Sequence, residues 1–439
     1  YLLTSTAVTP LYGKLSDIHG RRCMMLIAIS LFVAGSLTCA LAPSMTALVF
    51  SRGLQGMGGG GLMALAQTII ADIVSPRERG RYQGYIAAVF AASSIGGPVL
   101  GGFLTQHVDW SLIFWINLPL GFAAFGMTSI VLRRVPYHPR KHKIDVAGAV
   151  LMMLAAVALL LALSWGGRKF DWVSLEIAAL LVTSGALWGL FAWRLRRAEE
   201  PFLPLAVLGN PVVRTAALAG ACTMATLVGM TIMVPLYFEV VLHMNASQSG
   251  MALIPQMTAT VVFSTVSGRL MMHLTHYKRV GLIGTACAML ALLTLAVWPT
   301  SLSTVSVLAL LAVVGSGLGT VFPISTVCMQ NAVMQHQMGI ATGAANFFRA
   351  LLSSLLVAVL GAIVLSGLGG STGTAVETLA HAASAETLRE AFRYVFLACA
   401  LVSGMAFLIA MEERTLRGPA RHSPEAGAPT APATPIPAE

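Results

Sequence analysis

Long apolar runs, each close to the length of a membrane-spanning helix, alternate with short polar segments along most of the chain. A helix that crosses a bilayer needs about 20 predominantly apolar residues. Twelve such runs cover residues 24–41, 47–70, 82–104, 112–132, 146–165, 174–193, 212–238, 250–272, 281–298, 302–328, 343–368 and 394–411. A thirteenth, shorter run covers residues 1–12, so we expect the chain to begin inside a helix. The pattern predicts an all-α membrane protein with 13 visible helices.

The composition supports this interpretation. Hydrophobic residues make up 56% of the 439 residues and charged residues only 10%, whereas soluble proteins carry about 25% charged residues. The six cysteines lie far apart and form no Cys-x-x-Cys pair, which argues against a disulfide scaffold. The chain has no P-loop and no His or Cys spacing typical of a metal site. We therefore predict neither an enzyme nor a cofactor.

The net charge of +10 is concentrated on one side of the predicted helices. Of the 27 Lys and Arg residues, 21 lie in alternate connections, four lie in the remaining ones, and Arg52 and Arg349 lie inside apolar runs. Cytoplasmic loops of membrane proteins carry such an excess of positive charge. The distribution favours the lipid bilayer over nucleic acid as the partner. It predicts a multi-pass protein of the cytoplasmic (inner) membrane with a cytoplasmic C-terminus, in which one upstream helix would complete a set of fourteen.

The first polar connection contains the motif GKLSDIHGRR at residues 13–22. Gly13 and Gly20 allow a tight turn and a close approach of helices. Asp17 can accept hydrogen bonds at the start of the next helix and pair with Arg21 four residues later. The alternative is that these charges only mark a cytoplasmic loop.

The second motif, RGLQGMGGGG at residues 52–61, places an arginine inside an apolar run. An arginine that faces lipid costs at least about 2.5–3.5 kcal/mol. We therefore expect Arg52 to face the interior of the bundle, where it can act on a nearby carboxylate or on a substrate. Snorkelling from a helix end to the lipid headgroups is the alternative.

The third motif, SSIGGPVLGG at residues 93–102, combines small residues with a proline. Gly97, Gly101 and Gly102 allow helices to pack closely, and Pro98 removes one helical hydrogen bond. This segment is a hinge candidate, and a purely structural packing role is equally compatible with it.

In order and position, the three motifs resemble the A, B and C motifs of the major facilitator superfamily. The stretches DIVSPRERGR (72–81), INLPLG (116–121) and GIATGAANFFR (339–349) are also similar to that family. The two helices at residues 146–193 resemble the extra pair of the fourteen-helix drug:proton antiporter branch. The likeness covers residues 1–415, with Ser93 in place of the first glycine of the third motif and Ser111 where arginine is common.

The resemblance implies a major facilitator fold of two six-helix bundles with two additional central helices. The expected domains are an N-terminal bundle at residues 1–135 that lacks its first helix, an inserted helix pair at 136–200, a C-terminal bundle at 201–416 and a disordered cytoplasmic tail at 417–439. The resemblance also implies that Asp17, Arg21 and Asp72 form a cytoplasmic charge relay that gates transport. Arg52 would take part in proton transfer, and the Pro98 segment would seal the cavity of an antiporter.

Candidate substrate-binding residues are few. Of the 17 acidic residues, only Asp72 and Glu239 fall within or at the ends of apolar runs. Glu239 either lies in solvent at an outer helix end or lines the mouth of the cavity. Gln55 and Asn346 are polar residues within apolar runs and complete the candidate set.

Together these patterns predict a secondary transporter that exports small amphipathic compounds or drugs in exchange for protons. Export of one metabolite or siderophore-like product is the alternative within transport, and a transport-inactive membrane scaffold or sensor is the alternative outside it. The sequence leaves open whether a periplasmic adaptor protein takes part.

Overall fold

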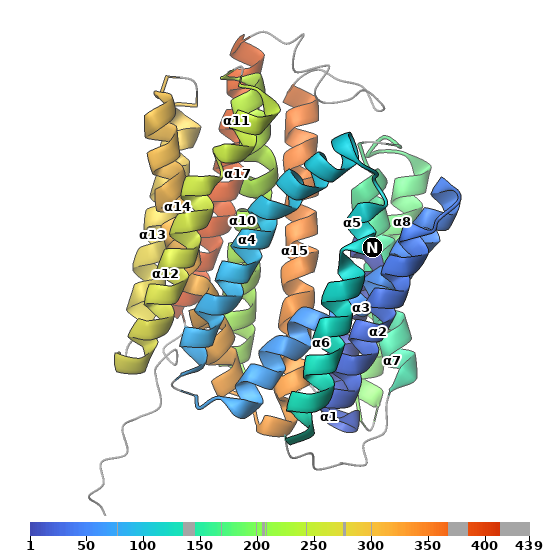
Figure 1. Cartoon of the computed structure of the whole chain (residues 1–439). Helices are drawn as coiled ribbons and strands as arrows, with labels where there is room; N and C mark the ends of the chain where they lie inside the picture. Colours follow the sequence, from blue (N-terminus) through green and yellow to red (C-terminus); the bar gives the residue numbers. More distant parts are fainter. Residues whose placement is uncertain are drawn as a thin grey trace, which may run out of the picture.

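The computed structural model describes residues 1–76, 78–134, 145–167, 169–198, 200–203, 207, 209–242, 244–274, 278–299, 301–367 and 385–412. These residues form a bundle of long helices, and the described part contains an isolated β-bridge between Gly166 and Phe170 but no strand (Figure 1). The predicted all-α fold is confirmed.

The first half of the chain forms one bundle. α2 packs along α3, α1 packs on α3, and α6 packs on α2, while α4 contacts this bundle mainly through α5. A small core of Tyr12, Met24, Ala28 and Leu65 joins α1, α2 and α3. The elements are α1 (Leu2–His19), α2 (Arg21–Ala40), α3 (Met45–Ile73), α4 (Arg79–His107), α5 (Leu112–Trp115) and α6 (Asn117–Val131).

The second half forms a larger bundle with a larger core. Tyr237, Phe392 and Phe396 meet edge to face or tilted at its centre, and the Tyr237 hydroxyl donates to the carbonyl of Pro299. The elements are α10 (Pro211–Val240), α11 (Ala246–Met251), α12 (Ile254–His273), α13 (Lys278–Val297), α14 (Thr304–Asn331), α15 (Met338–Gly367) and α17 (Ala385–Glu412).

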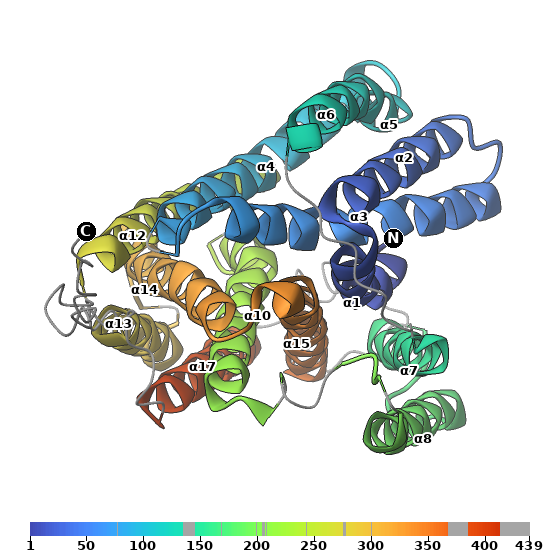
Figure 2. The ribbon, with the colours of Figure 1, turned by 90° about the horizontal axis from the view of Figure 1, so that it is seen from below.

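The halves meet along two helix pairs, α1 with α15 and α4 with α12. We call this interface the seam. One end of the bundle carries the α1–α2, α3–α4 and α12–α13 connections. We call it the basic end, because Arg21, Arg79 and Lys278 lie there. It is the lower end in Figure 1 and the end nearer the viewer in Figure 2.

The two additional helices are central in the sequence but lie at the edge of the molecule. α7 (Val146–Trp165) and α8 (Leu175–Arg197) pack on each other, and α7 contacts both α1 and α15 (Figure 2). The pair therefore covers one side of the seam without entering either bundle.

Ten helical segments of the described residues have the length and hydropathy of a membrane span. α1, α3 and α4 are not among them. These three helices carry glycine, serine, threonine and glutamine on buried faces, as Thr9, Gly60 and Gln83 illustrate. On the outside, Phe122, Met127 and Leu401 are each more than 60% exposed, as expected of side chains that face lipid. The chain is a multi-pass membrane protein.

Several helix boundaries differ from the prediction, and α17 begins nine residues earlier than predicted, at Ala385. α1 does not end near Tyr12 but continues through Lys14 and Asp17 to His19, because its polar residues face protein. The run at 112–132 divides into α5 and α6 at Ile116, and the run at 250–272 is preceded by the separate helix α11. The predicted tail at 417–439 lies outside the described residues.

Candidate functional site

The α1–α2 connection is a turn of one residue. Gly20 has a φ of 90°, in the region that glycine adopts without strain. The turn places Arg21, the first residue of α2, beside the end of α1 and the end of α3. Its side chain contacts Asp17 at 2.5 Å and Asp72 at 2.7 Å.

These three residues form what we call the seam cluster (Asp17, Arg21 and Asp72). Their side chains are only 8–13% exposed. Arg21 also donates to the Ser16 hydroxyl, which in turn donates to the carbonyl of Gly13. Burying three charges is costly unless each is paired and hydrogen-bonded. One oxygen of Asp72, Oδ1, is buried without a hydrogen-bond partner among the described residues.

Asp17 connects the cluster to the other half of the molecule. Its carboxylate accepts hydrogen bonds from the backbone N–H groups of Gly339 (3.1 Å) and Ile340 (2.9 Å). Both groups belong to the first turn of α15, where N–H donors have no partner within the helix and the helix dipole favours negative charge. We expected Asp17 to cap the next helix, α2. The structure instead places it on α15, more than 300 residues away.

Glycines on both sides allow this contact. A Cβ atom at Gly13 would collide with the carbonyl group of Gly339, and a Cβ atom at Gly339 would collide with Gly13, Asp17 and Arg21. The helices α1 and α15 can therefore approach closely only where both residues are glycine.

A second crossing of the seam joins α4 and α12. Gly80 and Gly268 face each other so closely that a Cβ atom on either would meet the other's backbone. Arg79, the first residue of α4, donates to the side chain of Asn331 (2.8 Å) and to the carbonyl of Ala71 (2.6 Å). Sequence analysis missed this crossing, although the glycine in each helix was visible.

Amide side chains continue the seam toward the middle of the bundle. Asn346 donates to Gln67 at 2.8 Å, and Gln330 donates to the carbonyl of Gln67 at 3.3 Å. Together with the glycine crossings, these bonds close the seam from the basic end to the level of Asn346.

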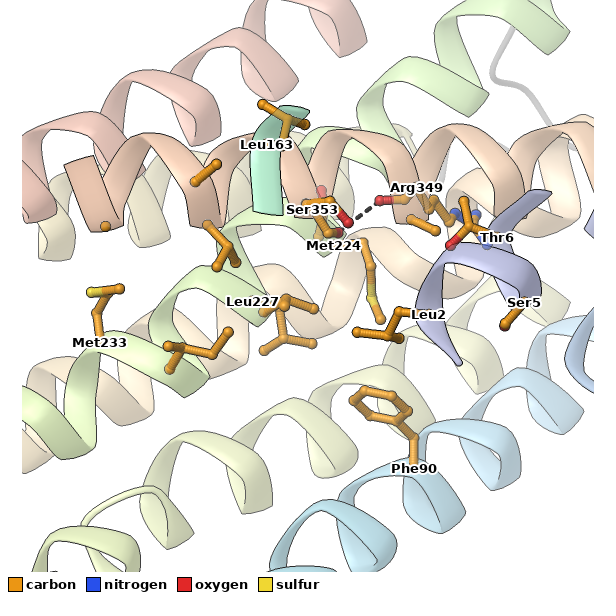
Figure 3. A pocket seen from close by; sticks show the side chains of 18 of the residues that line it. Leu2, Ser5, Thr6, Phe90, Leu163, Met224, Leu227, Met233, Arg349 and Ser353 are labelled. Carbon is orange, nitrogen blue, oxygen red and sulfur yellow. Dashed lines mark hydrogen bonds between the residues drawn. The ribbon is translucent and has the colours of Figure 1, made fainter. Parts of the chain in front are cut away.

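Above this level a cavity of about 1260 Å³ separates the halves (Figure 3). Its lining runs from Thr9, Asn346 and Arg349 in the middle of the bundle to Glu239 near the opposite end. The wall is largely apolar. Apolar side chains that line it include Met63, Phe90, Met224, Leu227, Val228, Met233 and Met257. Its volume exceeds the roughly 300–1,000 Å³ typical of small-molecule pockets.

The charged residues of the lining are Glu239 and Arg349, as far as the described residues show. Arg349 lies on α15 and is only 3% exposed. It donates to the hydroxyls of Ser325 (3.1 Å) and Thr326 (2.9 Å) and, at 3.4 Å, to the side-chain oxygen of Asn346. The sequence shows Arg349 as an arginine within an apolar run and predicts no role for it.

Arg52 and Gln55 lie outside the lining of this cavity. Arg52 donates to Gln55 at 2.7 Å and stacks over the rings of Tyr1 and Phe114. Gln55 is buried between α2 and α3, where its amide donates to Ser36. The structure thus places Arg52 inside protein, and it gives Gln55 no contact with the cavity.

The third motif lies in α4, which is a continuous helix through residues 93–102. A Cβ atom at Gly97 would meet nothing within 4 Å, and one at Gly101 would only touch Ile113. Close packing at these glycines is absent in the described part of the structure. The side-chain position of Pro98 and the surroundings of Gly102 lie outside what the structure describes.

Known proteins share this architecture. The family model of the Major Facilitator Superfamily matches residues 1–358. An uncharacterized MFS-type transporter of Mycobacterium tuberculosis is 32% identical over 376 residues, which is 86% of this chain and 55% of that protein. The multidrug transporter protein MdtP of Bacillus subtilis is 32% identical over 370 residues, or 83% of this chain and 67% of that protein. The chain thus spans about half to two thirds of the length of these relatives.

A solved structure supports the fold. The human organic anion transporter MFSD10 (TETRAN) matches 92% of this chain and 81% of its own, with a TM-score of 0.61 and 16% identity. At this identity the likeness shows the fold alone. The helix bundles, the motifs and the matching family model agree with one another. The chain therefore belongs to the major facilitator superfamily, a family of membrane transporters.

Proposed function

We propose that this protein is a secondary transporter that exports small amphipathic compounds across the cytoplasmic membrane in exchange for protons. In alternating access, two bundles rock around a binding site near the middle of the membrane and expose it to one side at a time. The observation that carries the proposal is the asymmetry of the seam. The halves touch at the basic end, while the cavity between them extends toward the opposite end.

The orientation follows from charge. The basic end carries most of the lysines and arginines, and positively charged connections remain on the cytoplasmic side. With that orientation, the cavity extends outward and the seam cluster closes it from the cytoplasm. This arrangement corresponds to the outward-facing state of an exporter.

The substrate class follows from the cavity wall. Methionine, leucine and phenylalanine offer an adaptable apolar surface, which suits ligands of varied shape. MdtP, a relative of 32% identity, is named as a multidrug transporter. Glu239 is the one carboxylate in the described lining of the cavity. A cavity with so few acidic groups also suits a neutral or anionic compound, so a single product of that kind is the second candidate substrate.

Proton coupling is proposed from the second motif. Arg52 lies half-buried among Gln55, Tyr1 and Phe114 away from the cavity. A cation in this position favours the ionised form of any carboxylate close to it. Binding and release of a proton by such a carboxylate would then depend on how close the neighbouring helices bring it to Arg52.

An efflux assay tests the proposal. The transporter is produced in a host that lacks its own drug pumps, and dye accumulation is compared with that of the same host carrying an empty vector. We expect lower accumulation, and we expect an uncoupler to abolish the difference. Equal accumulation in the two hosts would contradict export. A difference that the uncoupler leaves unchanged would contradict proton coupling.

A further inference from the structure

We propose that the inner end of the cavity is a binding subsite for the carboxylate, or a similar anionic group, of an amphipathic substrate, with Arg349 as the residue that binds it. This inference rests on the proposed transport function and names the charge of the substrate.

The guanidinium of Arg349 is incompletely satisfied. It has five N–H donors and remains charged in proteins. The described residues accept three hydrogen bonds from it, all through neutral oxygens, and Nε is buried without a partner. Phe322 covers the group at 4.9 Å from its ring centroid. Burying a cation is costly unless an anion pairs with it, and here every partner is neutral.

No carboxylate in the described part of the chain meets this requirement. The guanidinium packs beside Gly220 of α10, since a Cβ atom there would lie 3.0–3.1 Å from Nη2 and Nε. Glu239, the acidic residue of the cavity lining, lies 19 residues further along α10. That separation is about 28 Å along a helix, far beyond the reach of an ion pair.

The surroundings favour a ligand with one charged end. At the closed end of the cavity, Asn346, Ser325 and Thr326 accept hydrogen bonds from Arg349 and hold its guanidinium in place. From there toward the opposite end, Met224 and Leu227 of α10 and Phe90 of α4 offer apolar surface (Figure 3). A ligand with an anionic head group at Arg349 and an apolar body among these side chains would match both the charged end and the apolar wall of the cavity. Arginine binds carboxylates through two parallel N–H···O bonds.

Binding measurements with three matched probes test the subsite. The probes are 1-naphthylacetate, its neutral amide and the cationic 2-(1-naphthyl)ethylamine, titrated against the purified transporter without a membrane gradient. We expect the carboxylate to bind at least about tenfold more tightly than the amide, as a charged hydrogen-bonded contact predicts. We expect the amine to bind most weakly. Equal binding of the carboxylate and the amide would overturn the proposal.

Variants assign the preference to Arg349. Arg349→Gln should weaken carboxylate binding far more than amide binding and so abolish the carboxylate preference, and Arg349→Lys should retain part of it. The control is Arg197→Gln, which removes a charge from the end of α8, outside the cavity lining. If Arg349→Gln does not fold, Thr326→Val replaces it, because it removes one hydrogen bond that orients the guanidinium. A preference of undiminished size in the variant used would overturn the assignment.

These binding measurements, together with the efflux assay, separate this inference from the proposed function. A transporter that binds the carboxylate through Arg349 but exports nothing would refute export and retain the subsite. A transporter that exports dyes but binds the amine most tightly would refute the subsite and retain export.

Discussion

Asp17 is the residue at which the two halves depend on each other. Its carboxylate is shared between an ion pair with Arg21 and two N–H groups of α15. The ion pair lies within the first half and can move with it as a unit. At Asp17, opening the seam would therefore break only bonds to neutral donors, which water can replace. This makes the contact suitable for a transition between two states of similar free energy.

We predict that Asp17→Asn reduces efflux several-fold without lowering the amount of protein in the membrane. The amide keeps the shape of the side chain but loses the charge that binds Arg21 and the start of α15. Hydrogen bonds to charged groups contribute about 1.5–3 kcal/mol, which is enough to shift a two-state equilibrium about tenfold or more. The measurements are dye efflux and membrane abundance.

The matched control is Lys14→Gln, which removes a charge from the same turn of α1. Lys14 is half-buried and lies in the same motif. Unchanged efflux by Asp17→Asn, or an equal loss in Lys14→Gln, would argue against a specific role of Asp17 in the seam.

We predict that Gly13→Ala lowers transport although it improves the helix. Within a helix, alanine is more favourable than glycine by about 1 kcal/mol. At Gly13, however, the new Cβ would collide with the backbone of Gly339 and separate α1 from α15. Gly126→Ala is the control, since a Cβ atom there meets nothing within 4 Å. Efflux should fall in the first variant and persist in the second, and equal efflux by both would show that the close approach is dispensable.

At the scale of helices, α7 and α8 act as one attached unit. Asp145 caps α7 by accepting from the N–H of Gly148 (3.0 Å), and it also binds Arg194 of α8 at 3.1 Å. Near the middle of the pair, the Ser184 hydroxyl donates to the carbonyl of Ala155. The pair is thus held at the basic end and at mid-depth, while α7 contacts α1 and α15 across the seam.

We predict that Asp145→Ala destabilises the protein by about 1–3 kcal/mol. The substitution removes a helix cap, worth about 1 kcal/mol, and leaves Arg194 without its carboxylate. The measurement is the thermal unfolding of the purified protein in detergent. Glu176→Ala, on an exposed first turn of α8, should leave the unfolding temperature unchanged. Equal melting of Asp145→Ala and the unaltered protein would refute the role of this cap.

At the scale of the whole molecule, the sequence predicts the helices well and their long-range partners poorly. The apolar run at 146–165 became α7 with the same bounds, because a helix in lipid must be apolar along its length. The polar end of α1 was assigned to a loop, although its charges are buried against α15. Asp17, Arg21 and Asp72 were predicted to lie together, and they do. Gly339, Asn331 and Arg349 were not assigned to the site, because no local pattern specifies which distant helix each of them meets.

The seam gives a direct prediction about the transport cycle. If the two halves rock, the contact between Arg79 and Asn331 at the basic end must break in every cycle. We introduce Arg79→Cys and Asn331→Cys into a chain without its six native cysteines and join the pair with a short bifunctional thiol reagent. Transport should stop, and with a reagent that contains a disulfide, a reducing agent should restore transport.

Probe binding to the cavity from the opposite end should persist in the crosslinked protein, because that end lies beyond the closed seam. Each single-cysteine variant treated in the same way controls for labelling alone. Transport that continues at full rate in the crosslinked protein would mean that the basic end never opens, and alternating access would then not describe this molecule.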